Sequence, residues 1–348
     1  MLQRKPGKLA VAAAVMACAL FHVPVQAETP AAFYRGRTVT VHVAVGAGAY
    51  DLYARVLIRH FPQHIPGPPT MIVNNMPGAG GVKAANYFAN VAPNDGTALL
   101  VPLKPVAMTQ LLRSGGIKYD ASKFNWIGSM VDAPGVLAVW HEAPVRKLED
   151  ARTVETAMAS TGVGGETFIF PTVINSVLGT RFKVITGYKG MTNMLLAVER
   201  GEVHGVSTVY GSLLGLKPEW LAGGKVRFLA QVTEERTADL PDIPAVVEFA
   251  KTDDEREILR FLTLSNVIGR SIVAPPGIPA SRLAALRAAF DATVRSSSYL
   301  AEVKKRGIQV NPTSGARVQE NVKRLIATPK ATVNKVKEAI VGSTGSKK

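Results

Sequence analysis

The stretch VTVHVAVGAGAYDLYAR, residues 39–55, decides how the chain begins to fold. Valine occupies every second position of its first half, which is typical of a strand packed in a sheet. The small residues 46–49 then predict a tight turn, and residues 50–60 carry their apolar side chains on one face of a helix. A helix that begins directly after such a turn offers unpaired backbone N–H groups to an anion.

Two interpretations of this turn remain open on spacing alone. The dinucleotide-binding pattern G-x-G-x-x-G needs a third glycine, but Asp51 stands at that position, and its carboxylate would repel a pyrophosphate. Alternatively, Asp51 caps the helix and the small residues only keep the connection short.

Composition limits the class of protein. The chain has 348 residues, 47% of them hydrophobic, which is enough for a buried core and indicates about two domains. Its formal net charge of +15 would attract anions. The lysines and arginines are dispersed and aromatic residues are not interleaved with them, so the sequence does not indicate a nucleic-acid partner.

The N-terminus predicts export. Residues 1–27 contain three cations, then an apolar stretch, then a small-residue cleavage site after Ala27, as in a secretory signal peptide. Cleavage would leave the mature chain with a net charge of +12. It would also remove Cys18, the single cysteine, so we expect a mature protein without disulfides. An exported protein of this size without disulfides suits the periplasm. Attachment of a lipid to Cys18 is the alternative, but more apolar chain follows it.

Strands and helices alternate through the rest of the chain, which predicts an α/β fold with a mostly parallel sheet. Residues 126–140 read as two strands with a break at residues 132–135, a candidate crossing between domains. Further strands are expected at 70–75, 97–101, 184–186, 203–209, 226–232 and 266–274. Helices are expected at 82–91, 148–159, 166–178, 191–200, 280–294 (capped by Ser281), 298–306 and 315–326.

Six short motifs follow one another in an order that resembles a known family. They are NMPGAGG at 75–81, APNDGT at 92–97, GYKG at 187–190, GKVRFLA at 224–230, LPDIP at 240–244 and VAPPGIP at 273–279. In this order the chain resembles a Bug-type periplasmic solute-binding protein of the tripartite tricarboxylate transporter family, from about residue 34 to the last helices.

The resemblance implies a two-lobe periplasmic-binding-protein fold of the Venus-flytrap, type II-like kind, with two interdomain crossings. We expect lobe 1 to comprise residues 28–132 and 258–340, lobe 2 to comprise 133–257, and residues 341–348 to form a disordered tail. It also implies capture of an organic carboxylate, either a di- or tricarboxylate or an aromatic acid, and its delivery to the permease subunits of the transporter. We expect a monomer without metal or cofactor.

The resemblance also indicates which residues bind the ligand. The first turn contributes Gly46, Ala47, Gly48, Ala49, Tyr50 and Asp51, and the second contributes Ser160, Thr161, Gly162, Val163, Gly164 and Thr167. Neighbouring loops contribute Leu103, Lys104, Tyr188, Lys189 and Tyr210. Tyr50 replaces a small residue, and Glu166-Thr167-Phe168 departs from a common histidine-leucine pair. Many members of the family carry an acidic residue near the position of 208–210, which could bind an amino group. This chain has Thr208, Val209 and Tyr210 there, which argues against an amino-acid ligand.

Other functions find less support in the residues. His60 and His64 have the spacing of metal ligands on a helix, but Pro62 lies between them and indicates a loop. No G-x-S-x-G motif occurs and no thiol survives cleavage, so a hydrolase lacks its nucleophile pattern. A periplasmic sensor subunit for a two-component system would bind the same ligand, and the sequence does not separate it from a transport receptor.

Overall fold

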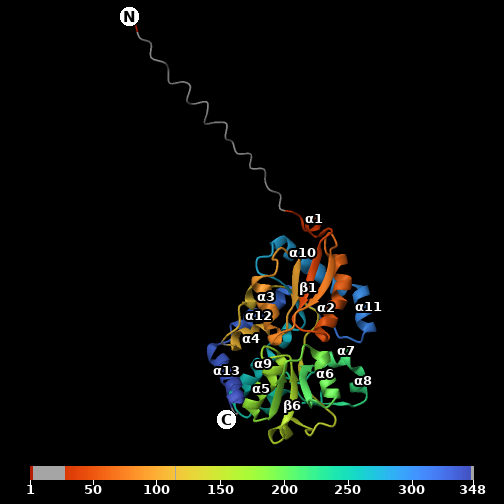
Figure 1. Cartoon of the computed structure of the whole chain (residues 1–348), viewed down its shortest axis with the longest axis vertical. Helices are drawn as coiled ribbons and strands as arrows, with labels where there is room; N and C mark the ends of the chain where they lie inside the picture. The colour runs from red at the N-terminus through yellow and green to blue at the C-terminus, as the bar shows by residue number, and fades with distance from the viewer. Residues whose placement is uncertain (3–27, 114, 346–348) are drawn as a thin grey trace.

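The computed structural model describes residues 1–2, 28–113 and 115–345. The expected signal peptide and Cys18 therefore lie outside the described residues, apart from the first two positions. The described chain forms two α/β halves, one above the other in Figure 1, each built around its own sheet.

The first sheet has six strands in the order β11-β4-β10-β3-β1-β2 in the part of the chain that the structure describes. Its strands are β1 (Thr38–Val43), β2 (Thr70–Asn75), β3 (Ala98–Val101), β4 (Asn125–Ser129), β10 (Ser271–Ala274) and β11 (Thr313–Ser314). All four residues of β3 are buried, which fits a central strand covered on both faces.

The second sheet has five strands in the order β7-β6-β8-β5-β9, again within the described residues. They are β5 (Gly135–Trp140), β6 (Thr156–Ser160), β7 (Phe182–Thr186), β8 (Gly205–Val209) and β9 (Val226–Val232). All five residues of β8 are buried, so this strand is the core of the second half.

Helices cover both sheets (Figure 1). In the first half they are α1 (Pro30–Tyr34), α2 (Ala49–His60), α3 (Val82–Asn90), α4 (Val106–Leu112), α10 (Ala280–Arg295), α11 (Ser297–Lys305) and α12 (Gly315–Ile326). In the second they are α5 (Glu166–Leu178), α6 (Met191–Glu199), α7 (Tyr210–Leu216), α8 (Pro218–Ala222), α9 (Asp253–Thr263) and α13 (Lys330–Gly345). Short 3-10 turns are η1 (Phe61–His64), η2 (Ala79–Gly81), η3 (Ala121–Lys123), η4 (Leu148–Arg152), η5 (Val246–Phe249) and η6 (Asn266–Ile268).

The expectation of a mostly parallel sheet is wrong, because both sheets are mixed. Strand β1 is parallel to β2 and β3, and β6 is parallel to β7 and β8. Strand β10 is antiparallel to β3 and β4, and β5 is antiparallel to β8 and β9. Both β5 and β10 are the first strands after the chain crosses from the other half. Each therefore enters its sheet from the end at which the neighbouring strands leave it.

Four local expectations are also wrong. The helix expected at 148–159 is η4 followed by β6, because residues 156–160 pair with two neighbouring strands. Strand β10 begins only at Ser271, after η6 and a glycine with φ +59°. Helix α10 is preceded by Pro279, so Ser281 lies inside the helix. Helix α13 extends to Gly345, so most of the expected tail is helical, and residues 346–348 lie outside the described residues.

Two crossings connect the halves, and they lie side by side. Residues 130–134 lead from β4 to β5, and residues 233–270 lead from β9 back to β10. The backbone N–H of Met130 donates to Arg270 O (3.0 Å), Arg270 N–H donates to Val131 O (3.0 Å), and Ala133 N–H donates to Asn266 O (3.1 Å). These bonds join the crossings into one hinge region.

Helix α13 makes a further passage between the halves. It follows α12, which packs on β4 of the first sheet, and it packs against α5 and α9 of the second half. Lys335 Nζ lies 2.7 Å from Glu257 Oε2 and 3.0 Å from Asp254 Oδ1 at this contact. The lobe boundaries at 132/133 and 257/258 stay a prediction, and α9 extends across the second of them.

No helix among the described residues combines the length and the apolar character needed to cross a bilayer.

Strand β4 provides a stability test. A Cβ added at Gly128 would overlap the ring of Phe290, a fully buried residue of α10. We expect Gly128→Ala to lower the free energy of unfolding by about 1–3 kcal/mol, the usual cost of overpacking a core, in urea denaturation. Gly115→Ala is the control, because a Cβ there meets nothing within 4 Å. Equal stability of the two variants would contradict the packing of α10 on β4.

Candidate functional site

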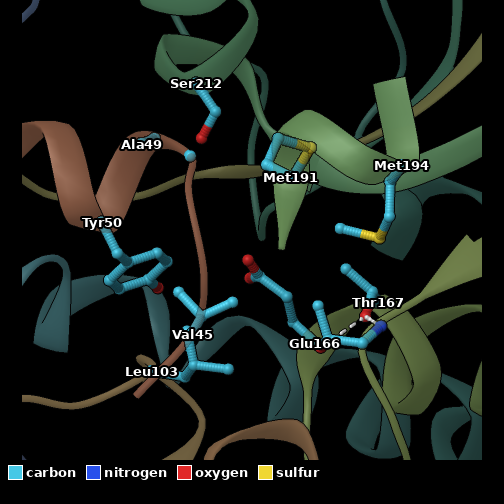
Figure 2. A pocket seen from close by; sticks show the side chains of 11 residues that line it. Val45, Ala49, Tyr50, Leu103, Glu166, Thr167, Met191, Met194 and Ser212 are labelled. Atoms are coloured by element: carbon cyan, nitrogen blue, oxygen red, sulfur yellow. Dashed lines mark hydrogen bonds between the residues drawn. The ribbon is translucent and has the colours of Figure 1, made fainter. Parts of the chain in front are cut away.

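A cavity lies between the two halves, where the carboxyl ends of several strands meet (Figure 2). Its volume is about 30 Å³. It is lined by Val45, Gly48, Ala49, Tyr50 and Leu103 from the first half and by Thr161, Glu166, Thr167, Met191, Met194 and Ser212 from the second. Because about 10–15 Å³ holds one water, a larger molecule can enter only if the halves move apart.

The first glycine turn touches the second half through its backbone. Gly46 N–H donates to Lys189 O (2.7 Å), and Thr192 N–H donates to Ala47 O (3.3 Å). A Cβ at Gly46 would lie 2.9 Å from Lys189 O, so this approach requires glycine. The turn therefore forms part of the contact between the halves as well as one wall of the cavity.

The second turn, residues 160–165, is held by hydroxyl groups and also meets the first half. Ser160 Oγ lies 3.0 Å from Thr167 Oγ1 and accepts from Gly162 N–H at 3.1 Å. Across the interface, Thr109 Oγ1 donates to Gly164 O (2.8 Å). A Cβ at Gly164 would lie 2.6 Å from Ala79 O, in the loop of the NMPGAGG motif. The motif thus packs its backbone directly against the second turn.

Lys104 and Glu166 form an ion pair between the two halves. Lys104 is fully buried after β3, and Glu166, 7% exposed, is the first residue of α5. Lys104 Nζ lies 2.7 Å from Glu166 Oε2, and it donates to Ala133 O (2.6 Å) and Asn266 Oδ1 (3.0 Å). The lysine thereby joins the second half and the hinge region at one point.

Burial dominates the proton affinity of Lys104 and of the neighbouring phenol. It lowers the pKa of Lys104, while the Glu166 carboxylate opposes this shift. Burial also raises the pKa of Tyr50, and the nearby Glu166 carboxylate acts in the same direction. Tyr50 stays a neutral phenol whose Oη accepts from Lys104 N–H at 3.2 Å.

Arg270 is a second buried cation beside the cavity. It has no exposed surface, and its Nη2 donates to Ser212 Oγ, which lines the cavity, at 2.6 Å. Its guanidinium lies 4.5 Å from the ring centre of Tyr53 and 5.5 Å from that of Tyr50. Nε and Nη1 have no hydrogen-bond partner among the described residues. Such a buried, incompletely paired cation is costly to a protein and favours the approach of an anion.

The structure gathers about a third of the expected site residues around the cavity. Gly48, Ala49, Tyr50, Leu103, Thr161 and Thr167 line it. Gly46, Ala47, Lys104, Ser160, Gly162 and Gly164 lie directly behind them through the contacts above.

The other expected residues lie elsewhere. Val163 is 42% exposed, and Lys189 is exposed, with its backbone O accepting from Gly46 N–H of the first turn. Tyr188 packs on the apolar core of the second half, and Tyr210 packs against Phe228. Asp51 pairs with Arg55 at 2.9 Å and accepts from Asn75, so its side chain does not cap α2.

Five cavity residues were not expected from the sequence: Val45, Glu166, Met191, Met194 and Ser212. Three of them, Glu166, Met191 and Ser212, lie in the first turn of helices that follow strands β6, β7 and β8. The strand-to-helix pattern that identified the first turn could have identified these positions too. Arg270 carried no sequence signal, because it precedes a short strand.

Comparisons with known proteins agree with this architecture. The profile described as "Tripartite tricarboxylate transporter family receptor" matches residues 58–346. A UPF0065 protein of Bordetella bronchiseptica is 28% identical over 229 residues, 64% of this chain and 65% of that protein. A UPF0065 protein of Cupriavidus necator is 28% identical over 248 residues, 68% of this chain and 71% of that protein.

Solved structures share the fold. The periplasmic binding protein BugD has a TM-score of 0.71 at 21% identity and covers 88% of this chain and 98% of its own. MatC of Rhodopseudomonas palustris with bound malate has a TM-score of 0.68 at 22% identity, with coverages of 85% and 99%. Rpa4515 of R. palustris with adipate has a TM-score of 0.67 at 22% identity, with coverages of 86% and 97%. The two-lobe fold is thereby confirmed, and because the family profile matches most of its length, the chain belongs to the tripartite tricarboxylate transporter receptor family.

Proposed function

We propose that this receptor captures an organic carboxylate in the cavity between its lobes and presents it to the permease of a tripartite tricarboxylate transporter. One observation carries the proposal: the fully buried and incompletely paired guanidinium of Arg270 lies beside a cavity formed by both lobes. The malate bound to MatC and the adipate present with Rpa4515 support the same class of ligand.

The backbone adds to this attraction. Helices α2, α5 and α6 all begin at the cavity, with Gly48, Gly165 and Gly190 as their N-caps. Each helix N-terminus favours an anion by about 0.3–1 kcal/mol through its dipole. Closure of the lobes removes water and strengthens these interactions.

We further propose that the chain acts as a monomeric receptor without chemical turnover. Its ligand would then leave the protein unchanged, and mass spectrometry of the released ligand would detect any conversion. Export completes the proposal, since a receptor of this type works in the periplasm.

The class of ligand can be tested by thermal shift across a library of carboxylates, amines and sugars. We expect one or more carboxylates to raise the unfolding temperature, because a ligand at 100 times its Kd stabilises the folded state by about 2.7 kcal/mol. Stabilisation by amines or sugars alone would overturn the proposal.

Lobe closure can be tested at the second turn. A Cβ at Gly164 would press on Ala79 O and on Val82 Cγ2 in the closed form. We expect Gly164→Ala to raise the Kd of the stabilising carboxylate about tenfold or more in calorimetry, since overpacking costs about 1–3 kcal/mol. Val163→Ala, at the exposed neighbouring residue, is the matched control. If both variants bound the ligand with equal affinity, the contact of Gly164 with Ala79 would not be needed for ligand capture.

Export can be tested on the protein recovered from the periplasm. Intact-mass measurement is expected to give a chain that begins at Glu28, as the small-residue cleavage site after Ala27 predicts. A mass that includes residues 1–27, or a lipid on Cys18, would contradict cleavage at that site.

A further inference from the structure

The Glu166 carboxylate points into the cavity that should receive a carboxylate ligand (Figure 2). Glu166 is the first residue of α5, and its Oε2 lies 2.7 Å from Lys104 Nζ. Its negative charge is therefore placed at a helix N-terminus and beside a buried cation. These are the two features that would otherwise attract a ligand anion. The side chain therefore changes how many negative charges the cavity accepts.

The positive charge of Lys104 is already neutralised. Its ammonium donates hydrogen bonds to Ala133 O and Asn266 Oδ1, and Glu166 Oε2 lies 2.7 Å away as its counter-charge. The ion pair formed with Glu166 is neutral overall. Lys104 thus has no unpaired charge for a ligand while Glu166 is in place.

Arg270 is the cation left without a counter-charge. The single described hydrogen bond of its guanidinium goes to the neutral hydroxyl of Ser212, and the flat face of the guanidinium packs on Tyr53. The carboxyl groups of α2 and of the first crossing are engaged elsewhere: Asp51 pairs with Arg55, and Asp132 accepts from Asn311 Nδ2. Among the described residues no carboxylate pairs with Arg270, so the buried groups of the site carry one net positive charge.

The rest of the lining is mostly apolar. Val45, Ala49, Leu103, Met191 and Met194 surround the space in front of Glu166. The two methionines come from one face of α6, and their flexible thioethers adapt to apolar bodies of different shape. Polar groups reach the cavity as hydroxyls of Tyr50, Thr161, Thr167 and Ser212.

We propose that this receptor selects a monocarboxylate with an apolar body, and that Glu166 is the residue that excludes dicarboxylates. The inference rests on the proposed capture of a carboxylate. One negative charge neutralises the unpaired guanidinium of Arg270. A second carboxylate on the ligand would be buried beside Glu166 with no free cation to pair with, which opposes binding.

Matched ligands of equal length test this selection directly. Hexanoate, adipate and 6-aminohexanoate share six carbons and carry one negative charge, two negative charges and no net charge. Calorimetry at about pH 7 on the wild-type protein would compare them, with the pairs butyrate and succinate, and benzoate and terephthalate, covering other sizes. We expect the monocarboxylate of the best-binding size to bind at least about tenfold more tightly than its dicarboxylate partner.

Glu166→Gln tests whether the residue itself sets the preference. The amide keeps the size of the side chain and removes its charge, which leaves Lys104 without its carboxylate. We expect the preference to fall about tenfold or more, mainly through tighter binding of the dicarboxylate. Glu155→Gln is the control, because Glu155 lies on the same lobe and its side chain is 67% exposed. If Glu166 had a purely structural role, its replacement would weaken the binding of both ligands equally and leave the ratio of their Kd values unchanged.

The outcomes distinguish this inference from the proposed function. Tighter wild-type binding of a dicarboxylate would overturn the selection and keep carboxylate capture. If 6-aminohexanoate bound most tightly, Glu166 would be a binding partner for an ammonium group of the ligand, and the proposed selection would again be wrong. If the ratio of the two Kd values were unchanged in Glu166→Gln, Glu166 would not be the residue that excludes dicarboxylates. If no carboxylate bound, the selection and the capture proposal would both fail.

Discussion

The arrangement of the two lobes depends on one ion pair in their interface, Lys104 with Glu166. Lys104 comes from the loop after β3 and Glu166 from the start of α5, so the pair exists only when the lobes are closed. The same ammonium binds Ala133 and Asn266, one from each crossing. Because a buried charge without a partner is costly, separation of the lobes must bring water to both groups. Opening and hydration of the site are therefore one event.

Backbone contacts around the pair set how closely the lobes approach. Gly46 meets Lys189 on one side, and Gly164 meets the Ala79–Gly80 region on the other. Side chains would hold the lobes apart at both places, so glycine is required for the closed distance. This explains why two of the family motifs, NMPGAGG and GYKG, lie at the lobe interface rather than in the core.

Much of the fold could be predicted from local patterns in the sequence. Strand β2 and helices α5 and α12 have the expected limits, because their apolar spacing and neighbouring glycines agree. The predictions failed where distant parts of the chain decide the structure. Residues 156–160 become a strand because β7 and β8 lie beside them, and the directions of β5 and β10 follow from the crossings.

The candidate site was predictable to the same degree. Both glycine turns were found, since a strand, small residues and a helix follow one another in sequence. Arg270 was not found, because its importance comes from Tyr53 and Ser212, which are far away in the chain. In the sequence Glu166 is only a departure from the family pattern, and its role depends on Lys104, which lies on the opposite lobe.

The last helix changes the mechanics of the molecule. Helix α13 belongs by sequence to the end of a chain whose preceding helix covers the first sheet, yet it packs on α5 of the second lobe. Residues 327–329 are thus a third connection between the lobes, in addition to the two crossings. Helix α13 also contacts α4 of the first lobe, so it lies against both lobes in the closed form. Any rotation that opens the cavity must therefore carry α13 with one lobe and shift its contact with the other.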